Sequence, residues 1–203
     1  MAGGRAQDGD AERRGGEAVD ARVRDLLDAG DPKAAATLAI KTHGPELLRY
    51  LRAVLAREAD AQEAFSAVCE RLWKALPEFR GEASLRTWCF RLAWSAAADL
   101  KKEAWTTRGQ RLDTTDAGRL SDDGKTSSWL REERLRLTLA QLREALTLEE
   151  QGLLRLRVDQ GLSWAECAQV LARGAKAPTV DALMKRFERV KARLGALARG
   201  EAP

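Results

Sequence analysis

A helix-forming stretch near the middle of the chain carries an aromatic ring among polar and cationic side chains. Arg91, Trp94, Ser95, Lys101 and Lys102 share one face at helical spacing. Such a stripe suits single-stranded nucleic acid, because bases stack on aromatic rings while Lys and Arg pair with phosphates. An alternative interpretation is that this is the central helix of a bundle, buried on both sides.

The elements that position this stripe can be read from the residues around it. Gly81 predicts a turn before the helix, and Ser84 can cap the first turn because its hydroxyl accepts from an otherwise unpaired backbone N–H. The opposite face of the helix is apolar and needs a core to cover it. It consists of Leu85, Trp88, Cys89, Leu92, Ala96 and Leu100.

Two capping boxes mark helix starts nearer the C-terminus. They are Thr147 with Glu150 and Ser163 with Glu166, at the spacing that lets each side chain pair with the other residue's backbone N–H. A turn over 173–177 and a long last helix follow, which is the layout of a helix-turn-helix. Cations dominate the polar side of that last helix and fit DNA phosphate, although a solvated amphipathic helix has the same pattern. These cations are Lys185, Arg186, Arg189, Lys191, Arg193 and Arg199.

Composition limits the function classes. The chain has 203 residues and a formal net charge of +4, which permits nucleic-acid binding without requiring it. Cys69, Cys89 and Cys167 lie far apart at apolar positions and are interpreted as core thiols. His43 is the only histidine and has no second ligand or base nearby in the sequence. We therefore expect no enzyme, cofactor or metal site, and the absence of a signal peptide or membrane span predicts a cytoplasmic protein.

The expected fold class is all-α, with two helical domains joined by a flexible linker. Asp31 and Pro32 predict a helix start, while Gly44 and Pro45 are expected to interrupt that helix. Trp73 is expected to pack on the buried side of the next helix. The expected organisation is a disordered tail over 1–17, a first domain over 18–104, a linker over 105–128 and a second domain over 129–199.

The central stretch resembles the DNA-melting and −10-recognition segment of the extracytoplasmic-function sigma factors, in the sigma-70 family. Its matching residues are Phe79, Arg80, Gly81, Ser84, Thr87, Trp88, Phe90, Arg91, Ala93, Asp99, Lys101 and Lys102. Ser95 departs from the usual Asn. The resemblance implies that the melted −10 strand is contacted by Phe79, Arg80, Gly81, Ser84, Trp88, Arg91, Trp94, Ser95, Lys101 and Lys102.

The other two blocks resemble the same family. The helix from about Asp60 is similar to the one that grips the clamp helices of the largest polymerase subunits, which implies contacts by Asp60, Gln62, Glu63, Ser66, Glu70 and Arg71. The segment from Leu146 to Leu194 is similar to the −35-binding domain, which implies DNA contacts by Thr179, Asp181, Ala182, Lys185, Arg186 and Arg189. Asp181 and Ala182 replace cationic or polar residues, so base readout should differ or be weaker there.

The resemblance thus implies a dissociable sigma subunit of bacterial RNA polymerase that recognises promoters and melts DNA. Its partners would be core polymerase, promoter DNA that is duplex at −35 and single-stranded at −10, and an anti-sigma factor. Two alternatives remain open. One is a sigma-like adaptor that binds polymerase without reading promoter sequence, and the other is a helix-turn-helix regulator that needs no polymerase.

Overall fold

The computed structural model describes residues 4–55, 57–108, 145–172 and 177–199, and these residues form an all-α protein without strands. The predicted fold class is confirmed for this part of the chain. Residues 109–144, which contain most of the predicted linker and the helix expected from Trp129 to Ala145, lie outside it apart from Ala145. The expected turn over 173–177 also lies outside it, apart from Ala177.

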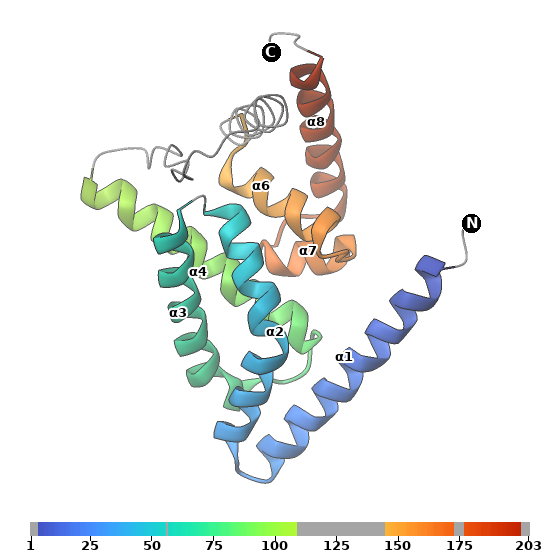
Figure 1. Ribbon diagram of the computed structural model, residues 1–203, viewed down its shortest axis with the longest axis vertical. Coiled ribbons are helices and arrows are strands. Elements are labelled where there is room, and N and C mark those ends of the chain that lie inside the picture. Colours follow the sequence, from blue (N-terminus) through green and yellow to red (C-terminus); the bar gives the residue numbers. More distant parts are fainter. Residues whose placement is uncertain (1–3, 56, 109–144, 173–176, 200–203) are drawn as a thin grey trace, which may run out of the picture.

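The first two helices are α1 (Gly4–Asp28) and α2 (Pro32–Val54), which meet at a tight turn and diverge from it (Figure 1). Gly30 takes a left-handed conformation in this turn, with φ of 76°. Asp31 accepts a hydrogen bond from the Ala34 backbone N–H at 2.9 Å, and Pro32 opens the helix. The helix start predicted at Asp31 and Pro32 is therefore confirmed.

Two expectations for this region are wrong. The tail over 1–17 was expected to be disordered, but the backbone is helical from Gly4. Buried Val23 anchors this helix in the core. Each residue added to an existing helix gains one backbone hydrogen bond, so the helix can continue beyond its apolar part. The helix α2 also runs through Pro45 instead of ending at His43. Gly44 has no Cβ to clash with the proline ring, and a Cβ there would lie only 3.4 Å from the Phe65 ring.

The next helices are α3 (Glu58–Ala75), the short η1 (Leu76–Glu78) and α4 (Leu85–Arg108). They pack with α2 as a bundle (Figure 1). Phe90 lies at its centre, fully buried and 5.4 Å from the Tyr50 ring in an edge-to-face contact. Because α4 continues to Arg108, the first domain extends beyond the predicted boundary at residue 104.

The C-terminal unit consists of α6 (Leu148–Leu154), a π-helical turn η2 (Arg155–Asp159), α7 (Trp164–Val170) and α8 (Val180–Ala198). Both predicted capping boxes are present, and Gly161 has a left-handed φ of 65° before α7. Trp164 packs on Phe187 of α8 with ring centroids 5.4 Å apart. The predicted helix-turn-helix layout is confirmed by α7 and α8.

The two units are not separate in space. Buried Leu153, Leu156, Leu162 and Cys167 belong to the same apolar cluster as the core of the first bundle. The α7 helix lies against α4, and α6 with η2 lies against α2 (Figure 1). The helix-turn-helix is therefore docked on the first domain.

Candidate nucleic-acid and polymerase interface

The loop before α4 presents residues expected to contact the melted −10 strand. Arg80, Gly81 and Ser84 are exposed, and Gly81 has a left-handed φ of 71°. Phe79 and Trp88 are half-buried and pack against each other with ring centroids 5.2 Å apart. Ser84 accepts a hydrogen bond from the Thr87 backbone N–H at 3.1 Å, so the predicted cap is confirmed.

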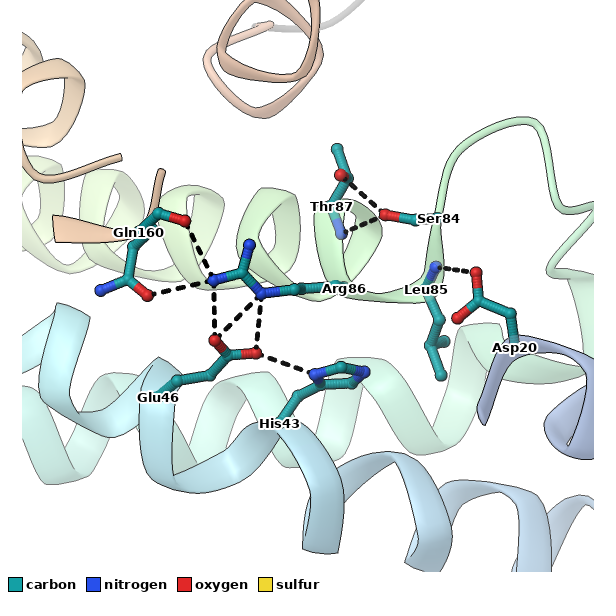
Figure 2. Close-up of polar contacts among 8 residues, drawn as sticks. All are labelled: Asp20, His43, Glu46, Ser84, Leu85, Arg86, Thr87 and Gln160. Atoms are coloured by element: carbon teal, nitrogen blue, oxygen red, sulfur yellow. Dashed lines mark hydrogen bonds and ion pairs between the residues drawn. The ribbon is translucent and has the colours of Figure 1, made fainter. Parts of the chain in front are cut away.

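A second group caps the same helix start from a distant element. Asp20 of α1 accepts a hydrogen bond from the Leu85 backbone N–H at 3.1 Å (Figure 2). A carboxylate is favourable at this end of a helix because the unpaired N–H groups carry partial positive charge. Burial raises the pKa of Asp20, while the Leu85 N–H works against that rise. Sequence reasoning missed Asp20, which lies 65 positions from its partner.

The aromatic and cationic stripe on α4 is only partly exposed. Arg91, Ser95 and Lys102 are exposed and Lys101 is half-buried, as nucleic-acid contact would require. Trp94 is the exception, since it is only 2% exposed and packs against Gly152 of α6. In this arrangement of the chain the C-terminal unit covers the Trp94 ring, and contact of Trp94 with the melted strand stays a prediction.

Two of the predicted site sets meet at Arg71. Its guanidinium donates to Ser95 Oγ at 3.1 Å and to Asp99 Oδ2 at 2.8 Å. Arg71 was expected at the polymerase-binding face and Ser95 along the melted strand. The contact joins α3 to α4, so it fixes the position of the predicted polymerase face relative to the predicted strand-binding face.

The polymerase face predicted on α3 forms a polar surface. Gln62, Glu63, Ser66 and Glu70 are exposed and Asp60 is half-buried. The bonds donated by Gln62 and Ser66 stay within α3, since Gln62 donates to Glu58 and Ser66 donates to the Gln62 carbonyl. These side chains therefore remain accessible to a partner.

Trp73 lies at the end of the same helix and is 50% exposed. The expectation that Trp73 packs in the core is wrong. Its neighbours Ala64, Val68 and Leu72 supply the buried side of α3 instead. A large exposed ring beside a polar surface adds apolar contact area to this face of the helix.

The recognition face predicted on α8 is open at its N-terminal end. Thr179 caps the helix by accepting from the Ala182 N–H at 3.2 Å. Asp181, Lys185 and Arg189 are exposed, as is Ala182. Arg186 differs, because it forms an ion pair with Glu149 of α6 at 2.9 Å. Lys185 and Arg189 thus carry the accessible positive charge of this set.

A polar network crosses from the first domain to the second at Arg86 of α4 (Figure 2). Its guanidinium donates to both carboxylate oxygens of Glu46, at 2.9 to 3.2 Å, and to the Gln160 backbone carbonyl at 3.2 Å. His43 Nδ1 lies 2.8 Å from Glu46 Oε1. Burial would raise the pKa of Glu46, but the hydrogen bonds from His43 and Arg86 outweigh it, so the pKa lies below 4.5.

A second bond crosses one turn away. The Thr87 hydroxyl donates to Glu166 Oε1 at 3.1 Å, while Glu166 also closes the capping box with Ser163. Burial would raise the pKa of Glu166, but bonds from the Ser163 hydroxyl and backbone and from Thr87 lower it below 4.5. Sequence reasoning identified Thr87 and Glu166 separately, but no local pattern connects residues 79 positions apart.

These two lowered pKa values predict an acid-sensitive contact. A carboxylate whose pKa is lower in the folded than in the unfolded state stabilises the fold above about pH 4.5, and this stabilisation is lost as the pH falls through the folded value. We expect the denaturant midpoint to fall when the protein is taken from neutral pH to below about pH 4.5. Glu166→Gln should reduce this pH dependence, because the Gln side chain does not titrate. Gln can still close the capping box, so the start of α7 should be kept. An identical pH profile for the variant would contradict this assignment.

Among the described residues, no group of three or more His, Cys, Asp or Glu side chains is placed to hold a metal ion. No described helix is long and apolar enough to cross a membrane.

The arrangement defines a class of protein: a helical bundle with an exposed cationic helix face and a docked helix-turn-helix. Comparison with known proteins specifies the family. Residues 39–107 match the family described as sigma-70 region 2. This segment holds α3, the loop 79–84 and most of α4, so the match places sigma-70 region 2 on the first bundle.

Comparison with solved structures supports the same fold. The chain is similar to a chain in the structure of CnrH in complex with the cytosolic domain of CnrY, with 22% identity and a TM-score of 0.61. The similarity covers 91% of this chain and 99% of that chain. Thus the likeness extends over both helical units. No curated protein matches the sequence.

Proposed function

We propose that this chain is a dissociable sigma subunit of the extracytoplasmic-function group, which brings core RNA polymerase to promoters and opens them. The observation that carries the proposal is a sigma-70 region 2 followed by a capped helix-turn-helix in one chain. The chain would act by binding, and the polymerase would supply catalysis. In this scheme the protein works in the cytoplasm.

In this proposal each exposed surface contacts a different partner. The polar surface of α3 would contact polymerase through Asp60, Gln62, Glu63, Ser66 and Glu70. The loop at Phe79, Arg80 and Gly81 would hold a base flipped from the −10 strand, since stacking returns about 1–3 kcal/mol per base against an unstacking cost of a few kcal/mol. Lys185 and Arg189 on α8 would position duplex DNA at −35 through phosphates.

The test is run-off transcription with core polymerase, with and without this protein, on templates with randomised upstream sequence. We expect enrichment of paired −35 and −10 elements only when the protein is present. Transcripts that do not depend on the protein would contradict the proposal.

A second candidate is favoured by one observation. Asp181 is exposed in the first turn of α8, where a cation would otherwise face a base edge or phosphate. A sigma-like adaptor would bind core polymerase but would enrich no upstream sequence in the run-off assay. The absence of enrichment distinguishes the two functions. A partner protein that sequesters the chain is also part of the proposal, since the structurally similar CnrH is in complex with the cytosolic domain of CnrY.

Lys101 and Lys102 near the end of α4 give a specific prediction. Replacing both with Ala should weaken promoter opening, because each cation that pairs with a single-strand phosphate adds about 0.7 to the salt dependence of log K. We therefore expect the slope of log K against log salt to fall by about 1.4 in open-complex measurements. The matched control is Lys33→Ala with Lys41→Ala, which removes the same charge from an exposed face of α2. Equal losses in both variants would mean that only net charge matters.

A further inference from the structure

The surface of the first domain that receives the helix-turn-helix is built from both apolar and polar contacts. The Trp94 ring is buried against α6, while Arg86 reaches the Gln160 carbonyl and Thr87 reaches Glu166. Arg86, Thr87 and Trp94 lie within nine residues of α4. One face of α4 therefore holds the second domain.

The closest approach is at Gly152 of α6. A Cβ built on this residue would lie 2.7 Å from Trp94 Cζ3, and its three nearest atoms all belong to Trp94 and Tyr50 of the first domain. No residue larger than Gly fits there without moving the Trp94 ring, which is itself buried. The α6 helix can thus reach the first domain only because its contact residue lacks a side chain.

This docked arrangement conflicts with simultaneous contact at two promoter elements. Elements centred at −35 and −10 are about 25 base pairs apart, or about 85 Å along B-DNA. In the docked chain α7 touches both α4 and α8, so α4 and α8 are both held against one helix. The connecting segment 109–144 has a contour of up to about 120 Å, so the covalent link permits separation.

We propose that the α4 face formed by Arg86, Thr87 and Trp94 is a docking surface for the chain's own helix-turn-helix, and that this contact holds the free protein closed. Opening would release the ring of Trp94 and free α8 to reach the upstream element. The role in transcription rests on the proposed function, whereas the docking itself does not.

The test adds a side chain at position 152, and the resulting variants are called wedge variants. Gly152→Ala and Gly152→Leu should separate the two units in the full chain, because the added side chain meets Trp94. Ala is otherwise a better helix former than Gly, so α6 itself should not be weakened by that variant. Gly195→Ala is the matched control: it changes a helical glycine of α8 whose nearest neighbour is the movable end of Arg199. We expect a larger radius of gyration by solution scattering for both wedges than for the control.

Transcription with limiting protein supplies the second readout. We expect the wedge variants to give several-fold more run-off product than the wild type, and the control to give no increase. An unchanged radius in both wedges would overturn the docking surface. A larger radius with equal or lower transcription would overturn the inhibitory role. If neither the wild type nor any variant supports transcription, the proposed function fails. The radius of gyration then still tests the docking surface. A mass that rises with concentration in the wild type would show that the surface binds a second copy, which contradicts an intramolecular contact.

Discussion

Replacing Trp94 with Ala is expected to lower the free energy of unfolding by about 3–5 kcal/mol. The side chain is 2% exposed and fills the space between α4 and α6, so its removal exposes the Gly152 surface and leaves a cavity. Chemical denaturation measured by circular dichroism gives the change directly, since that signal does not depend on Trp fluorescence.

Trp73→Ala is the matched control for this prediction. The same side chain is removed from a position that is 50% exposed, so we expect a change of less than about 1 kcal/mol. If Trp94→Ala proved as mild as Trp73→Ala, the ring would not be covered by α6 in solution. That result would also argue for an open chain and against the docking surface.

The second large effect is expected for Arg86→Ala. The change leaves the Glu46 carboxylate partly buried with His43 as its remaining partner, and it removes the bond to Gln160. Hydrogen bonds to charged groups contribute about 1.5–3 kcal/mol each in net terms, so we expect a loss of about 2–3 kcal/mol in the same denaturation assay.

Arg52→Ala provides the comparison. Arg52 also pairs with a glutamate through several hydrogen bonds, but both Arg52 and Glu58 are half-exposed to solvent. Water and salt screen such a pair, so its loss should cost far less than the loss of Arg86. Similar losses for the two variants would show that the Arg86 network is as solvated as a surface pair.

The features that could be predicted from the sequence are local. The caps at Asp31, Ser84, Thr147 and Ser163 each involve residues within three positions of one another, so a short stretch contains all the atoms that matter. The apolar periodicity of α4 and the helix-turn-helix layout follow in the same way. Recognition of the family rested on such stretches, and the match over 39–107 bears it out.

Errors arose where a local preference met a larger structure. Proline generally ends a helix, but Gly44 has no Cβ to clash with the ring of Pro45, and it packs beside Phe65. The glycine-rich start of α1 has little apolar surface, yet it continues a helix that Val23 anchors in the core. In both cases the neighbouring element decided the outcome, and the local pattern does not contain it.

The sequence by itself determined where helices start, which of their faces are apolar and which carry cations, because these depend on neighbours along the chain. Only the tertiary structure decided that Trp94 is covered while Trp73 is exposed, that Asp20 caps α4 and that Arg86 bridges Glu46 to Gln160. These outcomes depend on segments brought together from 40 or more positions away. An aromatic residue at a helical position has the same local pattern whether another helix covers it or solvent does, so burial is set by packing.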